Sequence, residues 1–129
     1  MNFIIGGDGS GMMDLLELVQ KHNLHGRVEL LGGLPHDKVR DVLCRGHIFL
    51  NTSLTESFCI AILEAACCGL LVVTTDVGGV PEVLPPHMAY LAHPNEKSII
   101  RQIRRAVVNV NKTKTDNFYN EVASIYSWR

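Results

Sequence analysis

The stretch Phe58-Cys-Ile-Ala-Ile-Leu-Glu-Ala-Ala-Cys-Cys68, followed by Gly69 and then by Leu70-Leu-Val-Val-Thr74, decides the fold class. Its first part has the length and apolar character of a buried helix, and Gly69 stands where helices commonly end. Its second part is apolar and rich in β-branched residues, which is typical of a strand buried on both faces of a parallel sheet. The sequence therefore predicts a helix, Phe58–Cys68, that leads into a central strand, Leu70–Thr74.

The alternation of strand and helix continues on both sides of this stretch. Short apolar runs that end in Gly or small polar residues predict further strands at Asn2–Gly6, Val28–Leu31, His47–Leu50 and Met88–Ala92. Apolar residues at helical spacing predict helices at Met12–Leu24, Pro35–Cys44, Glu96–Val110 and Asn117–Trp128, with a short helical turn at Val80–Leu84. This is the pattern of an α/β protein with a Rossmann-like parallel sheet and helices on both faces.

Composition excludes several classes of function. The chain has 129 residues, of which 47% are hydrophobic and 19% charged, with a formal net charge of -1. This balance predicts a folded globular domain, and the lack of a basic block argues against a nucleic-acid partner. No apolar stretch is long enough to span a bilayer, and no secretory signal precedes the first strand. The cysteines at 44, 59, 67 and 68 lack zinc-site spacing, so we expect reduced thiols.

The loops that follow the predicted strands are candidates for ligand binding, because parallel sheets bind ligands at the carboxyl ends of their strands. One of them, Gly6-Gly-Asp-Gly-Ser-Gly11, leads from a strand into a helix, and its glycines would let backbone N–H groups approach a phosphate. It is neither a dinucleotide fingerprint, since Met12 stands where a third glycine is needed, nor a P-loop. A phosphate site and a simple strand-to-helix turn are both compatible with it.

Two carboxylates, Glu56 and Glu64, are separated by seven residues across a loop and the first turns of a predicted helix. Glu64 stands among apolar residues, where a carboxylate is costly unless it accepts hydrogen bonds, and the two hydroxyls of a ribose would donate them. Between the two, the N–H groups of Ser57, Phe58 and Cys59 open the helix and would receive a phosphate oxygen. Alternatively, Glu56 caps the helix and Glu64 pairs with a basic side chain.

Together these motifs resemble the C-terminal domain of the large retaining glycosyltransferase family that carries the E-x7-E signature and has the GT-B fold. The motifs that carry the resemblance, in the family's order, are Phe3-Ile-Ile-Gly-Gly-Asp-Gly9, Val28-Glu-Leu-Leu-Gly32, Glu56-(seven residues)-Glu64, Gly69-Leu-Leu-Val-Val73 and Gly78-Gly-Val-Pro-Glu82. Glu56-Ser-Phe-Cys59 departs from the family's usual E-G-F-G. This variant is similar to the branch that transfers N-acetylglucosamine to phosphatidylinositol, as are the segments 46–56, 77–85 and 126–129.

The resemblance implies that UDP-N-acetylglucosamine is the donor and phosphatidylinositol the acceptor, with retention of the anomeric configuration and no metal or other cofactor. It also implies one component of a membrane transferase complex at the cytoplasmic face of the endoplasmic reticulum, acting in the first step of glycosylphosphatidylinositol (GPI) anchor synthesis. The roles that the resemblance assigns are a catalytic Glu56 on the donor sugar, Glu64 on the ribose, the amides of Phe58 and Cys59 on the sugar and pyrophosphate, Gly7 and Gly9 at the phosphates, and Gly33 and Leu34 near the uracil.

Residues 1–129 are expected to form a partial donor-binding domain without the acceptor domain, because the chain opens in a strand and stops within a predicted helix. Family members usually place an Arg and a Lys on the pyrophosphate from a segment before the first strand. Charge-assisted hydrogen bonds are worth about 1.5–3 kcal/mol each, so we expect this chain alone to be inactive and to bind UDP weakly.

Two other functions stay open. One is a non-catalytic binding or assembly module of a glycosyltransferase complex. The other is a nicotinamide-dependent oxidoreductase, which only the Gly7-x-Gly9 turn favours, because the third glycine is missing and Glu29 falls at the start of its strand instead of its end.

Overall fold

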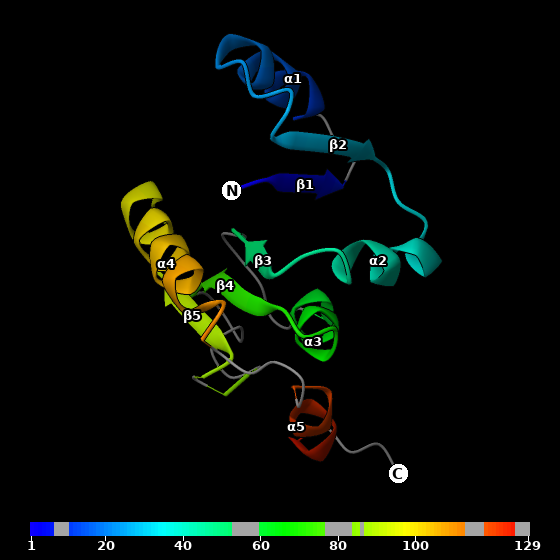
Figure 1. The fold of residues 1–129 in the computed structure, drawn as a ribbon, viewed down its shortest axis with the longest axis vertical. Coiled ribbons are helices and arrows are strands. Elements are labelled where there is room, and N and C mark those ends of the chain that lie inside the picture. The colour runs from blue at the N-terminus through cyan, green and yellow to red at the C-terminus, as the bar shows by residue number, and fades with distance from the viewer. Residues whose placement is uncertain (7–10, 53–59, 77–83, 86, 113–117, 126–129) are drawn as a thin grey trace. The chain divides into compact units, whose positions relative to one another are not determined.

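The structure, a computed structural model, describes residues 1–6, 11–52, 60–76, 84–85, 87–112 and 118–125. Within these ranges parallel strands and helices alternate along the chain, in two compact units, Met1–Val39 and Arg40–Arg129 (Figure 1). The α/β fold class expected from the sequence, with parallel strands and intervening helices, is confirmed.

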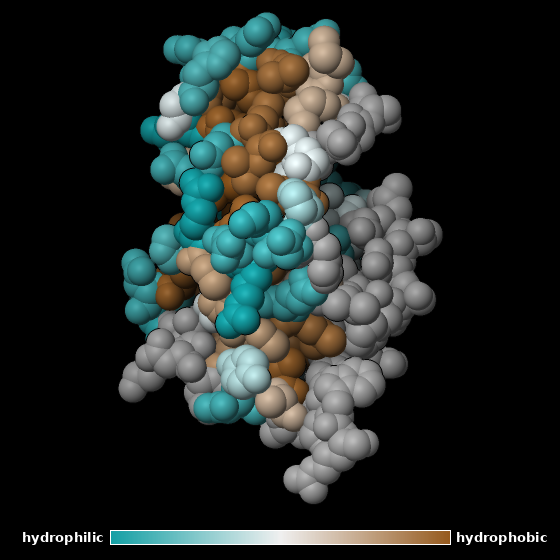
Figure 2. Space-filling model, turned by 90° about the vertical axis from the view of Figure 1, so that its right-hand side faces the viewer, coloured by the Kyte–Doolittle hydropathy of each residue, from teal (hydrophilic) through white to brown (hydrophobic). Residues whose placement is uncertain are grey.

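The first unit is a βαβ element. Its strands β1, Phe3–Gly6, and β2, Val28–Gly32, pair in parallel, and the connection between them contains α1, Met12–Lys21. The helix ends three residues before the predicted Leu24, because Asn23 adopts a left-handed conformation with φ 52°. The unit leaves much apolar surface uncovered, as the upper part of Figure 2 shows, and its exposed large apolar side chains include Phe3, Met13, Leu16 and Leu18.

The second unit contains a sheet of three parallel strands. In the order in which they pair, these strands are β3, Ile48–Asn51, β4, Leu71–Thr75, and β5, Ala89–Ala92. All five residues of β4 are buried, which confirms the prediction of a strand covered on both faces. The strand begins at Leu71 instead of the predicted Leu70, because the Leu70 N–H donates to the Ala65 carbonyl at 3.1 Å and so closes the preceding helix.

Helices cover this sheet from both sides. Figure 1 shows α4 on one side of the strands and α3 on the other; α4 contacts β4 and β5, α3 contacts β3 and β4, and α5 packs against α3. Gly69, at φ 85°, ends α3 as predicted. Asn95 caps α4, since its Oδ1 accepts a hydrogen bond from the Ser98 N–H at 2.9 Å. The bounds of these helices are Ile60–Cys67 for α3, Glu96–Asn109 for α4 and Phe118–Ile125 for α5. A further helix, α2, spans His36–Leu43 and contains the boundary along the chain between the two units.

Parts of three predicted elements lie outside the described residues. These parts are positions 58 and 59 of the helix before the central strand, positions 80–83 of the short turn, and positions 117 and 126–128 of the last helix. Leu84, the described end of the predicted turn, is a buried residue in a bend. Among the described residues, no helix has both the length and the apolar character needed to cross a membrane.

Candidate functional site

In the first unit, the carboxyl ends of β1 and β2 lie at the same sheet edge. The two strands are parallel and Gly6 is paired with Gly32, so the segment that follows β2 starts beside the end of β1. Leu34 lies directly against Gly6: a Cβ atom at position 6 would be 2.7 Å from Leu34 Cδ1. The structure therefore places two predicted donor-binding residues, Gly33 and Leu34, next to the start of the glycine-rich loop.

In the second unit, a polar pair joins the carboxyl ends of β3 and β4. Asn51 Nδ2 donates to Thr74 Oγ1 at 3.0 Å, and this hydroxyl donates to the Thr75 carbonyl at 3.4 Å. Both threonines are buried and Asn51 is half-buried, so the bonds are shielded in part from solvent and fix the strand ends at which the next loops begin. Sequence reasoning missed this pair. Asn51 and Thr74 are 23 positions apart, and only the strand register, which pairs the two residues, brings them together.

Glu64 lies in the middle of α3 and is half-buried. Ile62, Ala65 and Ala66 are fully buried, and the geometry of an α-helix places Glu64 on the opposite side from them. Within the described ranges no basic side chain lies within ion-pair distance of its carboxylate. The alternative in which Glu64 pairs with a basic side chain therefore finds no support in this part of the chain, and the carboxylate can accept hydrogen bonds from a ligand.

Two half-buried thiols follow Glu64 at the end of α3, and one of them, Cys67, interacts with the Glu64 carboxylate. Burial raises the pKa of Cys67; Arg40 opposes the rise, and the Glu64 carboxylate adds to it. Burial, and to a smaller extent a hydrogen bond with Cys44, raises the pKa of Cys68 to about 11. These two thiols are protonated at neutral pH and therefore poor nucleophiles. Cys44, Cys67 and Cys68, the cysteines in the described ranges, are free thiols, as expected from the sequence.

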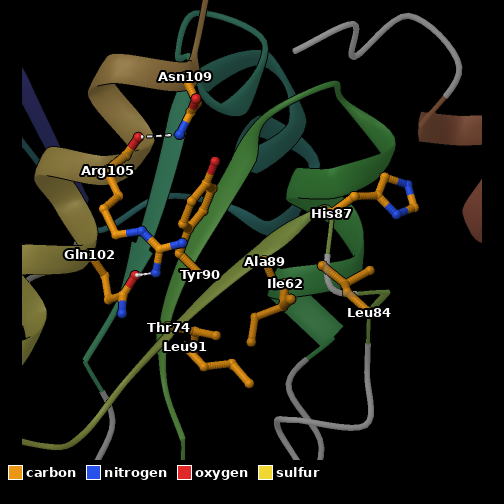
Figure 3. Close-up of a pocket in the computed structure, with 10 residues that line it drawn as sticks. All are labelled: Ile62, Thr74, Leu84, His87, Ala89, Tyr90, Leu91, Gln102, Arg105 and Asn109. Atoms are coloured by element: carbon orange, nitrogen blue, oxygen red, sulfur yellow. Dashed lines mark hydrogen bonds between the residues drawn. The ribbon is translucent and has the colours of Figure 1, made fainter. Parts of the chain in front are cut away.

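A cavity of about 450 Å³ lies beside β5, and Thr74 is among the residues that line it (Figure 3). The Arg105 guanidinium carbon stands 5.5 Å from the centre of the Tyr90 ring, and Arg105 also donates a hydrogen bond to Gln102. At the other end of the cavity, His87 pairs with Glu121 and so ties α5 to the turn before β5. Glu64, the predicted donor-binding residue that the structure describes in this unit, is not among the described residues that line this cavity, and Arg105 is already engaged by Tyr90 and Gln102.

The remaining predicted site residues, Gly7, Gly9, Glu56, Ser57, Phe58 and Cys59, lie outside the described residues. Their roles stay predictions. The described ranges hold no group of three His, Cys, Asp or Glu side chains arranged to bind a metal ion. What the structure adds is the position of Gly33 and Leu34 at the strand ends of one unit, and that of Glu64 on α3 in the other.

The chain is similar to known glycosyltransferases over its whole length. It is 51% identical over 129 residues to a phosphatidylinositol N-acetylglucosaminyltransferase subunit of Arabidopsis thaliana, and 49% identical over 132 aligned residues to the corresponding subunit of Homo sapiens. All of this chain is covered in both comparisons, and it spans only 29% and 27% of the two relatives.

The comparison with solved structures agrees with the fold. Sucrose-phosphate synthase from Thermosynechococcus elongatus superposes with a TM-score of 0.79 at 25% sequence identity, over 97% of this chain and 34% of that one. This likeness confirms the expected fold of a GT-B glycosyltransferase. The family model described as glycosyl transferases group 1 matches residues 1–120. The chain belongs to the group 1 glycosyl transferases.

Proposed function

We propose that this chain forms the donor-binding part of a retaining transferase that moves N-acetylglucosamine from UDP-N-acetylglucosamine to phosphatidylinositol, the first step of GPI anchor synthesis. The observation that carries the proposal is the identity of 51% and 49%, over the whole chain, with two subunits whose names state a transfer of N-acetylglucosamine to phosphatidylinositol. Since the chain spans under a third of these relatives, the acceptor would be bound by the remaining length of such an enzyme.

Glu64 is the proposed ribose-binding group. It stands half-buried on the side of α3 that faces away from the core, and no basic side chain of the described ranges neutralises it. A carboxylate has two oxygens, and each can accept a hydrogen bond from one hydroxyl of a vicinal diol. Gly33 and Leu34, at the end of β2, would lie along the uracil, where an apolar side chain beside a glycine offers a flat surface to a base.

The proposed chemistry needs little from the protein beyond the placement of charge. An inositol hydroxyl attacks the anomeric carbon, the bond from that carbon to the UDP oxygen breaks, and the hydroxyl proton passes to the leaving phosphate on the same face. Backbone N–H groups at positions 57–59 and near Gly7 and Gly9 would stabilise the negative charge that develops on this phosphate. Glu56 would hold the hydroxyls of the donor sugar.

In this proposal the enzyme uses no metal ion or other cofactor, since the chain has no DxD motif to hold a metal on the diphosphate. The enzyme acts with other subunits of a membrane complex at the cytoplasmic face of the endoplasmic reticulum, where its lipid acceptor lies. The names of the relatives support the part of this proposal that concerns a complex, because they describe a subunit of a phosphatidylinositol N-acetylglucosaminyltransferase.

The test is transfer of labelled N-acetylglucosamine to phosphatidylinositol by membranes that contain the intact enzyme. Loss of a carboxylate hydrogen bond predicts a fall of about 10- to 100-fold in kcat/KM for Glu64→Gln. Glu17→Gln, at an exposed position on α1, should transfer at the normal rate, and so should the unaltered enzyme in a chelator. A normal rate for Glu64→Gln would reject the proposed site, and a lowered rate that accompanies failed assembly of the complex would favour an assembly module.

A further inference from the structure

The outer side of α4 carries a cluster of cations. Ala106 is fully buried against the sheet, and helical geometry directs the opposite side of α4 to solvent. We define the cationic face of α4 as Lys97, Arg101 and Arg104 together with the aliphatic residues Ile100 and Val108; all five are exposed. These positions follow the helical repeat, so they form one continuous stripe.

The charge on this face is not balanced within the described part of the chain. None of its three cations forms an ion pair there, and Glu96, in the first turn, is the only acidic residue of α4. Arg105, beside the face, is by contrast held by Tyr90 and Gln102. Since the whole chain has a formal net charge of -1, the cluster reflects how charge is distributed and does not follow from a basic composition.

The aliphatic residues of the cationic face are exposed to solvent. Val108 is 62% exposed and Ile100 47% exposed, among the long basic side chains. A depression of about 430 Å³ on this side has five lining residues in the described part of the chain, all of them from α4: Lys97, Ile100, Arg101, Arg104 and Arg105. Among the described residues the surface is therefore the flank of a single helix, with no second wall of the kind that a groove for a peptide needs.

We propose that the cationic face of α4 binds the surface of a membrane that contains anionic lipids. A helix that binds a bilayer surface combines Lys and Arg side chains, which attract anionic headgroups, with apolar side chains that enter the boundary with the acyl chains, and the exposed side of α4 carries both kinds. A planar anionic surface also fits the flank of one helix better than a folded protein partner would. The inference rests on α4 alone and does not depend on the proposed donor site.

The test is co-sedimentation of the full chain with vesicles of phosphatidylcholine alone or of equal parts of phosphatidylcholine and phosphatidylserine. Each basic residue near an anionic surface changes the affinity for that surface by a factor on the order of five. Neutralising three basic residues should therefore lower the affinity for the anionic vesicles by about 100-fold. The test variant is Lys97→Gln/Arg101→Gln/Arg104→Gln. The control, Lys21→Gln/Arg27→Gln/Lys38→Gln, removes three exposed cations from the first unit and gives the same net charge.

The proposal expects that the unaltered chain binds only the anionic vesicles, that salt weakens the binding, and that the control variant binds normally. Ile100→Ser/Val108→Ser should lose affinity several-fold without any change of charge. Equal binding to both vesicle types, or equal losses in the two charge variants, would overturn it. Preferential binding of a labelled polyglutamate peptide over the anionic vesicles would also overturn it and would assign the face to an acidic protein. The circular dichroism spectrum of each variant checks that it is folded.

Discussion

The strand pair β1–β2 and the central strand β4 come from the same kind of strand-helix alternation but differ in burial. Every residue of β4 is buried, from Leu71 to Thr75. In β1, by contrast, Phe3 and Gly6 are exposed, and β2 has no fully buried residue. The difference shows that most of the buried apolar residues in the described ranges belong to the second unit, whereas the described ligand-binding candidates lie after β2 in the first unit and within α3 in the second. Stability and ligand binding should therefore respond differently to substitutions in the two units.

The largest expected effect contrasts a core leucine with its counterpart in the first unit. Leu71→Ala removes a side chain that is fully buried in β4 and should lower the free energy of unfolding by about 3 kcal/mol. Leu30→Ala, in β2, removes the same atoms from a half-buried position and should cost about half as much. Urea denaturation of both variants measures the difference. Equal losses would mean that the first unit is as tightly packed as the second.

A smaller effect is expected at the two glycines with left-handed backbones, one in each unit. Gly69 ends α3 at φ 85°, and Gly32 ends β2 at φ 72°. An alanine in this conformation costs about 1–2 kcal/mol of backbone strain, so Gly69→Ala and Gly32→Ala should destabilise by similar amounts. Gly26→Ala is the control, because its Cβ would have no neighbour within 4 Å and its backbone is not left-handed. Thermal melts measure the loss. A melting temperature for Gly69→Ala equal to that of the control would contradict the assigned helix end.

Gly6→Ala should change the position of the Leu34 side chain more than the stability of the fold. Its Cβ would lie 2.7 Å from the Cδ1 atom at the end of the Leu34 side chain, which can rotate away, so the expected cost is below about 1 kcal/mol. The displaced Leu34 should nevertheless lower UDP affinity a few-fold if it lies along the uracil. Titration of UDP into Gly6→Ala and into Gly11→Ala, whose Cβ would meet nothing within 4 Å, compares the two. Equal affinities would remove Leu34 from the proposed site.

The smallest expected effect on stability near neutral pH is that of Cys68. All the cysteines belong to the second unit. Burial and the Cys44 hydrogen bond raise its pKa from 9.0 to about 11. Between these values the unfolded chain loses the thiol proton and the folded chain keeps it. This contribution to stability is therefore complete below pH 9 and is lost as the pH rises to about 11. Unfolding measured across this range should show a steeper fall for the unaltered chain than for Cys68→Ala. Parallel curves would contradict the raised pKa.

Local patterns in the sequence predicted most of the fold. The apolar run after Gly69 predicted the buried strand, because a strand covered on both faces can carry almost only apolar residues. Asn95 and Gly69 mark helix ends through interactions within a few residues, so such boundaries can be found from local sequence. The end of α1 was missed, because Asn23, unlike glycine, adopts the left-handed conformation only occasionally.

The candidate site was less accessible to sequence reasoning. The hydrogen bond between Asn51 and Thr74 depends on the register of β3 and β4, and the contact of Leu34 with Gly6 depends on the parallel pairing of β1 and β2. Neither pairing leaves a local signal. Glu64 could be singled out because a carboxylate is unusual within an apolar helix, but the sequence left its partner open.

Glu64 is the central residue of the account, and its role can be measured directly. UDP and a UDP analogue that lacks both ribose hydroxyls are titrated, by NMR, into the unaltered chain and into Glu64→Gln. If Glu64 binds the ribose, the unaltered chain should prefer UDP by about 10- to 100-fold, and Glu64→Gln should lose most of that preference. Should Glu64→Gln distinguish the two ligands as well as the unaltered chain does, the carboxylate does not hold the ribose and the proposed donor site is wrong.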